Sequence, residues 1–217
     1  MSYLIRMIGQ NKEWVQTAKQ INNLGSISAD AISDLHSTDN CISTWDVNNK
    51  NKDDVKKGIQ ALTSGFRALE DIKIVYLDFD KLITSGFNII QTNGLTKIKN
   101  YEKLHRDISD LNSDKLQNLA KIILEEVWSK NTEIIHKQDI IYYLIEALND
   151  GLLEFNSLEK NVKQELASNI NKQLKKGKLK ESDFDKKVLD DIKEQIKKQN
   201  KKTNCRYEEF CERYNKK

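Results

Sequence analysis

The sequence predicts an α-dominated α/β protein, with a small mixed or parallel β-sheet in its N-terminal part and a helical C-terminal part. Apolar runs typical of strands alternate with amphipathic helical stretches over the first hundred residues. Beyond residue 99 only the helical spacing of apolar residues continues. The 217 residues also include no proline, so one obstacle to long uninterrupted helices is absent.

The elements expected before residue 50 are short. Residues 3–8 (YLIRMI) form an apolar run with strand character, and residues 12–22 carry apolar side chains about one helical turn apart. We expect a second short helix over residues 28–35 and a strand over residues 41–47 (CISTWDV).

The clearest unit follows between residues 41 and 78. Asn51 and Asp54 have the spacing of a capping box, with Asp in place of the usual Glu or Gln. Five apolar residues then share one helical face: Val55, Ile59, Leu62, Phe66 and Leu69. Residues 72–77 (IKIVYL) form a continuous apolar strand of the kind that is covered on both faces. Residues 41–78 therefore predict a βαβ crossover with parallel pairing, and residues 87–92 predict one more strand.

The spacing of apolar residues predicts four helices in the second half, joined by short polar loops. Their apolar stripes cover residues 116–127, 140–148, 158–174 and 184–196. Gly151 is placed to end the second helix. Asn156 with Glu159 and Ser182 with Asp185 have capping spacing at the starts of the third and fourth.

Charge and sequence pattern together divide the chain into three parts: an α/β domain over residues 1–98, a helical bundle-like region over residues 99–180 and a basic helical tail over residues 181–217. Residues 172–217 carry 16 basic and 9 acidic side chains, a net charge of +7, whereas the preceding residues carry a net charge of −4. An acidic body with a basic tail bears on the kind of partner that the chain can attract.

Cysteine usage predicts a cytoplasmic protein. Cys41, Cys205 and Cys211 are too few and too scattered for a disulfide framework, and Cys205 and Cys211 have no nearby His to complete a zinc site. The N-terminal apolar stretch is too short for a signal peptide, and no run approaches the roughly 18 apolar residues of a membrane span. The chain has 31 Lys against 5 Arg and is rich in Asn, a bias that a low-GC bacterial genome explains.

Two carboxylates end the strand at residues 76–80 (YLDFD). This segment resembles the first motif of haloacid-dehalogenase-type phosphatases over about nine residues. The resemblance implies that Asp78 attacks phosphorus, that Asp80 acts as general acid and base, and that Mg²⁺ lies between carboxylate and phosphate. Lys81 departs from that family, which has a flexible Gly there. The alternative is that both carboxylates simply end a buried strand.

The segment His105–Asn112 (HRDISDLN) resembles the catalytic loop of protein kinases. The resemblance implies that Asp107 accepts a hydroxyl proton and that Asn112 holds Mg²⁺. No Gly-rich phosphate loop precedes the segment and no D-F-G follows it. The alternative is a solvated loop in which Asn112 or Ser113 caps the next helix. His36, His105 and His136 have no metal-ligand spacing, and we expect them mostly on the surface.

Lysines of the C-terminal part can neutralise phosphates and give nonspecific, salt-dependent nucleic-acid binding. The candidates are Lys175, Lys176, Lys178, Lys197, Lys198, Lys201 and Lys202.

Because no coherent catalytic set emerges, the sequence predicts a non-enzymatic protein-interaction or regulatory component that docks on another protein and needs no metal or cofactor. For its setting we expect a bacterial phage-defence or toxin-immunity system. One alternative is a nucleic-acid-binding accessory protein that uses the basic C-terminal region. Another is a Mg²⁺-dependent phosphatase centred on Asp78.

Overall fold

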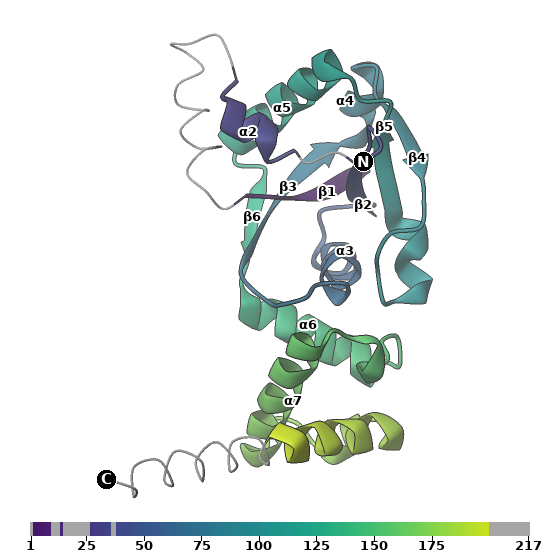
Figure 1. Cartoon of the computed structure of the whole chain (residues 1–217), viewed down its shortest axis with the longest axis vertical. Helices are drawn as coiled ribbons and strands as arrows, with labels where there is room; N and C mark the ends of the chain where they lie inside the picture. Colours follow the sequence, from purple (N-terminus) through teal and green to yellow (C-terminus); the bar gives the residue numbers. More distant parts are fainter. Residues whose placement is uncertain (1, 10–13, 15–26, 36–37, 200–217) are drawn as a thin grey trace, which may run out of the picture.

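A six-stranded β-sheet organises the computed structural model, which describes residues 2–9, 14, 27–35 and 38–199 (Figure 1). The strands are β1 (Tyr3–Ile8), β2 (Ile42–Val47), β3 (Ile72–Asp78), β4 (Asn88–Gln91), β5 (His105–Ser109) and β6 (Thr132–Ile135). Their order across the sheet is β4-β5-β2-β1-β3-β6, and every neighbouring pair is antiparallel. The prediction of an α/β protein is confirmed, but the mixed or parallel sheet is wrong.

The β2–α3–β3 unit shows why the prediction of parallel pairing was wrong. The helix α3 (Lys52–Ser64) does connect β2 to β3, as predicted. Because both strands are antiparallel to β1, they run in the same direction. However, β1 lies between them, and Tyr3 pairs with Val47 on one side and with Asp78 on the other. Local pattern gives the succession of elements, but it does not specify which strand lies next to which.

Two short strands lie beyond residue 99, where none was expected. β5 has the sequence HRDIS and β6 has TEII, so neither has enough apolar residues for a clear alternating pattern. β5 fills the place between β4 and β2, and β6 forms the edge beside β3. Residues 105–109 are therefore a strand and not a solvated loop.

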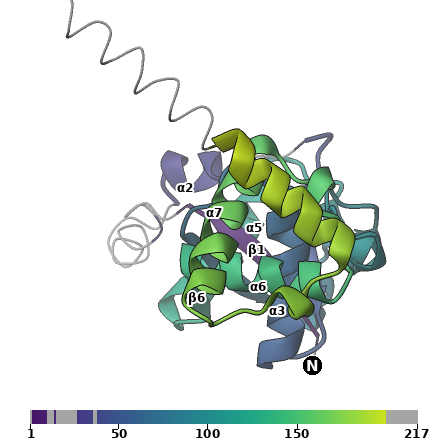
Figure 2. The ribbon, with the colours of Figure 1, turned by 90° about the horizontal axis from the view of Figure 1, so that it is seen from below.

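Helices cover both faces of the sheet (Figures 1 and 2). Along β3, Ile72, Ile74 and Tyr76 join one hydrophobic core, whereas Val75 and Leu77 join the other. This confirms the prediction that residues 72–77 are covered on both sides. The first core is closed by α3, α6 (Lys137–Asn149) and α7 (Lys160–Lys175), and the second by α2 (Ala29–Ser33), α4 (Phe79–Thr84) and α5 (Ser113–Trp128).

Several helix ends follow the predicted capping. The Asn51 side chain accepts a hydrogen bond from the Asp54 backbone N–H at 2.9 Å, and the Asn112 side chain caps α5 in the same way. Gly151 follows the C-cap of α6, and its φ of +67° is readily available only to glycine. Leu152 then donates to the carbonyl oxygen of Ala147 at 2.9 Å, which completes the end of the helix.

The starts of the last two helices differ from the prediction. α7 begins after Glu159, which makes no side-chain capping hydrogen bond, and Asn156 lies in a separate 3-10 turn. The last helix among the described residues begins at residue 186 and is described as far as residue 199, and Asp185 caps it by accepting from the Lys187 N–H at 2.8 Å. Ser182 lies in the preceding 3-10 turn. Spacing alone does not select among several possible caps in a polar loop.

Part of the basic C-terminal segment packs on the body of the protein. Phe184, Leu189 and Ile192 are buried in the core that α3, α6 and α7 share. Within the described ranges, no helix combines the length and the apolar character that crossing a membrane requires. The helix expected over residues 12–22 lies outside the described residues, except for Trp14.

Candidate functional site

A break in strand pairing marks the candidate site. The β1–β2 pairing ends at Ile5 and Trp45, although β1 continues beside β3 as far as Ile8 and β2 continues beside β5 from Ile42. In this break, Arg6 Nη1 donates to the backbone carbonyl oxygen of Ser43 at 3.1 Å. The sheet therefore opens between its two central strands, and a side chain supplies a hydrogen bond there.

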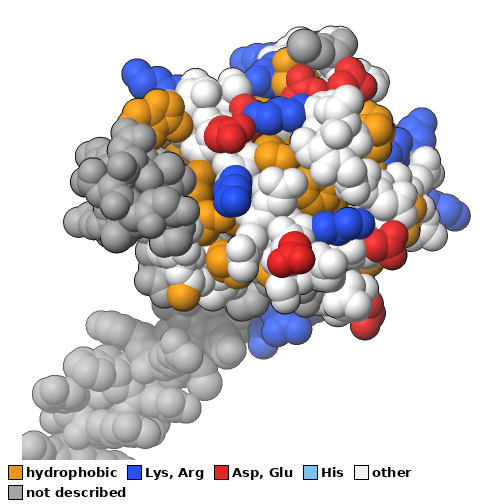
Figure 3. All heavy atoms as spheres, turned by 90° about the horizontal axis from the view of Figure 1, so that it is seen from above, with side chains coloured by type: hydrophobic (Ala, Val, Ile, Leu, Met, Phe, Trp, Pro, Cys, Tyr) orange, Lys and Arg blue, Asp and Glu red, His pale blue; other side chains and the backbone are white. Residues whose placement is uncertain are grey.

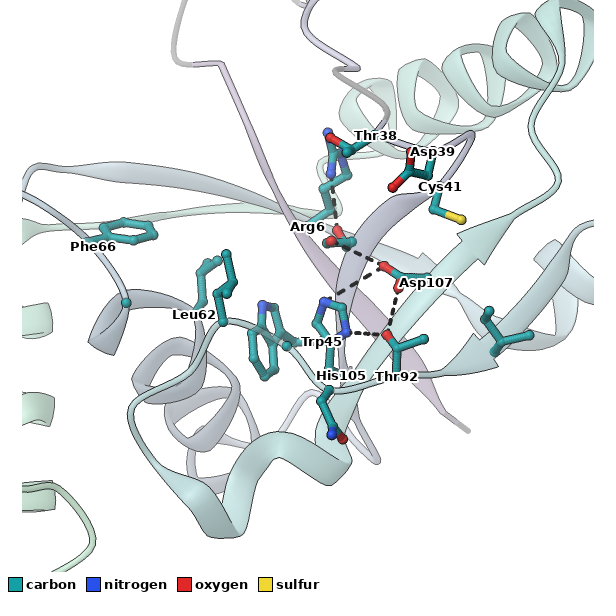
Figure 4. A pocket seen from close by; sticks show the side chains of 16 residues that line it. Arg6, Thr38, Asp39, Cys41, Trp45, Leu62, Phe66, Thr92, His105 and Asp107 are labelled. Carbon is teal, nitrogen blue, oxygen red and sulfur yellow. Dashed lines mark hydrogen bonds and ion pairs between the residues drawn. The ribbon is translucent and has the colours of Figure 1, made fainter. Parts of the chain in front are cut away.

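Two adjoining cavities, of about 780 and 490 Å³, meet at this break and share Arg6, Ser43, Trp45 and Leu62 as lining residues. The larger one lies on the α3 side of β5 and β2 (Figure 4). A concave site with apolar walls and a few convergent polar groups is the usual form of a binding pocket. We call the larger cavity the β4–β5 cleft.

A hydrogen-bonded network forms the polar part of the β4–β5 cleft (Figure 4). Asp107 accepts from the Thr92 hydroxyl at 2.6 Å and from the Ser43 hydroxyl at 3.2 Å. Thr92 Oγ1 also lies 2.7 Å from His105 Nδ1. Because the single hydroxyl hydrogen of Thr92 goes to the carboxylate, its oxygen accepts from His105 Nδ1–H. The neutral imidazole then has an acceptor at Nε2, which lies 3.9 Å from Asp107 Oδ1.

His105 is buried, contrary to the expectation of a surface histidine. Only 5% of the residue is exposed, and its ring meets Trp45 edge to face with centroids 4.9 Å apart. Burial lowers the pKa of His105, and the nearby Asp107 carboxylate partly opposes this effect. His136, by contrast, is exposed at the start of α6, as expected. His36 lies outside the described residues.

The rim of the β4–β5 cleft carries two exposed apolar side chains. Leu95 is 92% exposed, and Ile90 on the edge strand β4 is 40% exposed. The loop that carries Leu95 is anchored on the end of α3. The Ser64 hydroxyl contacts the Thr96 hydroxyl at 3.0 Å and accepts from the Lys97 N–H at 3.0 Å.

Two glycines allow the loop that carries Leu95 to pack closely against neighbouring residues. A Cβ at Gly65 would overlap the carbonyl oxygen of Leu95. A Cβ at Gly94 would lie 2.5 Å from the His105 ring and 2.6 Å from the Trp45 ring. The backbone on either side of Leu95 is therefore packed tightly, and the leucine side chain is presented from a fixed position.

Arg6 is a half-buried cation beside the cleft. Burial lowers the pKa of Arg6 to about 10, and the Asp34 carboxylate partly offsets this shift. Asp34 itself accepts from the Gly9 N–H at 2.7 Å and from the Trp14 indole at 2.6 Å. Arg6 Nε has no hydrogen-bond partner among the described residues. The Arg6 guanidinium is therefore incompletely satisfied.

The two carboxylates of the phosphatase-like segment lie elsewhere, at the start of α4. Asp78 is the N-cap of α4 and accepts from the Lys81 N–H at 3.0 Å, while Asp80 is exposed on the first turn. The antiparallel sheet sets Asp78 opposite Tyr3, at the start of β1, instead of beside the ends of parallel strands. In the ranges that the structure covers, no three or more His, Cys, Asp or Glu side chains are grouped to hold a metal ion.

The candidate nucleic-acid-binding lysines fall into separate places. Lys175 ends α7, Lys176 and Lys178 follow directly, and Lys197 and Lys198 lie on the final helix. Lys198 pairs with Glu194 at 2.6 Å. Lys201 and Lys202 lie outside the described residues.

The sequence drew attention to His105 and Asp107 only through the kinase-like segment, and it pointed to none of Ser43, Thr92 and Leu95. A usable signal was present in HRDIS, because strand alternation places His105 and Asp107 on the same side of the sheet. Their partners come from β2 and from the residue after β4, and no local pattern connects those segments.

The described fold defines an α/β protein with an antiparallel sheet covered on both faces and a cleft beside its β4 edge. Comparison of the chain with family models, with curated proteins and with solved structures found no match.

Proposed function

We propose that this protein is a non-enzymatic binding component that docks on another protein through the rim of the β4–β5 cleft. The observation that carries the proposal is the position of Leu95, which is 92% exposed although the backbone on both sides of it is packed. Because the backbone that carries Leu95 is already ordered, binding there loses little backbone conformational entropy. Burying a leucine in a partner contributes about 1.5–3 kcal/mol.

The edge strand β4 also supports the proposal that this rim is a docking surface. β4 pairs only with β5 among the described strands, and Ile90 projects from it into the cleft lining. An extended segment of a partner can add to such an edge through backbone hydrogen bonds, while side chains fill adjacent pockets. The polar groups of Asp107 are already bonded to Ser43 and Thr92, so a partner needs to supply mainly apolar contacts at the rim.

The test is co-expression with the product of each neighbouring gene, followed by size-exclusion chromatography with light scattering. The proposal expects a stable complex with one of them, which also tests the proposed phage-defence or toxin-immunity setting. Leu95→Asp should abolish that complex. Ile83→Asp is the matched control, because Ile83 is 46% exposed on α4, on the opposite face of the sheet. Uncomplexed monomer with every neighbour, or equal loss in both variants, overturns the proposal.

A further inference from the structure

A second concave surface lies between α6 and α7, at the end of the molecule that Figure 2 views from below. Its cavity has a volume of about 540 Å³. α6 contributes Gln138 and Tyr142, which are four residues apart and share one helical face. α7 and the turn after it contribute the remaining polar lining. We call this surface the α6–α7 groove.

One face of α7 lines the groove, because Asn169, Lys172, Gln173 and Lys176 recur at helical spacing. The end of α7 also positions Lys178. Gly177 has a φ of +67°, and the Lys178 N–H donates to the carbonyl oxygen of Gln173 at 3.0 Å. This is the hydrogen bond of a glycine-terminated helix end, and it holds the turn at the groove.

Among the described residues, no acidic side chain pairs with the lysines of the groove. None of its lining residues is acidic. Lys172, Lys176 and Lys178 form no ion pair with any residue that the structure describes. The nearby Glu165 is paired with Lys137, across α6 and α7. At the opposite end of the molecule, acidic and basic side chains are interspersed (Figure 3).

An exposed aromatic ring stands beside these lysines. Tyr142 is 53% exposed, and its ring lies edge to face against Tyr143 with centroids 6.3 Å apart. Tyr143 is partly buried and packs against the core that α3, α6 and α7 share, so it supports the Tyr142 ring from one side. The amide of Gln173 donates to Asn169 Oδ1 at 2.7 Å, which orients both amides along the groove. No other side-chain hydrogen bond joins these two amides to the part of the chain that the structure describes.

From this arrangement we infer that the α6–α7 groove binds single-stranded nucleic acid, without strong sequence preference. Lys172, Lys176 and Lys178 contact successive phosphates, and a base stacks on Tyr142. A cationic groove with an aromatic platform is the combination by which such strands are bound. An acidic peptide would satisfy the lysines equally well, but it would gain little from the Tyr142 ring. The inferred site is separate from the β4–β5 cleft and does not rest on the docking proposal.

The test titrates the full-length protein into a fluorescein-labelled oligothymidylate at several salt concentrations and follows anisotropy. The variant K172Q/K176Q/K178Q should reduce the slope of log K against log salt by about 2, because each phosphate contact on a single strand contributes roughly 0.7. Tyr142→Ala should weaken binding by about 5- to 100-fold and leave the slope unchanged. The control K99Q/K103Q/K121Q removes the same charge from exposed positions around the sheet and should preserve binding.

Three outcomes would overturn the inference. The first is no binding of wild type at low salt. The second is equal loss in the control variant, which would indicate a general effect of net charge. The third is an unchanged affinity in Tyr142→Ala together with equally tight binding of polyglutamate, which would assign the groove to an acidic peptide. Circular dichroism melting of each variant excludes unfolding as the cause.

Discussion

Gly65, at the end of α3, lies so close to the backbone of Leu95 that a Cβ at Gly65 would overlap the Leu95 carbonyl oxygen. Gly65 has a φ of −88°, which any residue adopts, so the requirement for glycine comes from this contact and not from backbone strain. The contact connects the end of α3 to the most exposed apolar side chain among the described residues.

Gly65→Ala should therefore lower the free energy of unfolding by about 1–3 kcal/mol, the usual cost of forcing extra volume into a packed site. Urea denaturation measures this loss. Ser129→Ala is the control, because Ser129 caps the end of α5 with similar backbone angles and is exposed. It should change stability by less than about 0.5 kcal/mol. A loss of equal size in both variants would contradict the proposed contact.

Thr92→Val keeps the shape of the side chain but removes the hydroxyl that joins His105 to Asp107. Two buried polar groups then lose a partner, and we expect a loss of about 1–3 kcal/mol. Thr84→Val is the control, because Thr84 is exposed and its hydroxyl only bonds back to its own helix. If Thr92→Val unfolds at the same urea concentration as wild type, the network contributes nothing to stability.

The lowered pKa of His105 predicts how stability depends on pH. The folded state binds its proton less readily than the unfolded state does, so acid favours unfolding. The contribution should be fully present above about pH 6.5, the ordinary pKa of histidine, and should be lost as pH falls through the lowered pKa. Urea melts from pH 7.5 to 5 should show this decline.

His105→Asn provides the control for this pH dependence. The asparagine amide occupies the place of Nδ1 and can still donate to Thr92, but it does not titrate. The decline between about pH 6.5 and 5 should be smaller in this variant than in wild type. The same slope in both proteins would assign the pH dependence to other groups.

Asp78 is the position at which the phosphatase alternative is tested. Asp78→Asn retains a good N-cap for α4 and should cost little stability, whereas Asp78→Ala should cost about 0.5–2 kcal/mol. Because Asp78→Asn separates chemistry from capping, we compare it with wild type in a Mg²⁺-dependent phosphatase screen. An equal background signal in both excludes the enzyme, and activity that Asp78→Asn abolishes would support it.

Elements with strong local signals could be predicted from the sequence. The apolar run of residues 72–77 predicted a strand buried on both faces, because consecutive side chains of a strand point to opposite sides. Asn51 and Gly151 predicted helix ends, because a cap depends on residues only a few positions away. The strong amphipathic stripes of α3, α5 and α6 are local signals of the same kind.

Strand order and the composition of the cleft could not be predicted in this way, because they depend on long-range contacts. β1 lies between β2 and β3, and the short strands β5 and β6 complete the sheet although their sequences have little alternation. The network of Ser43, Thr92, His105 and Asp107 joins three segments through contacts that are distant in sequence. Such pairings depend on which surfaces are buried together in the whole chain, and that is a property of no single segment.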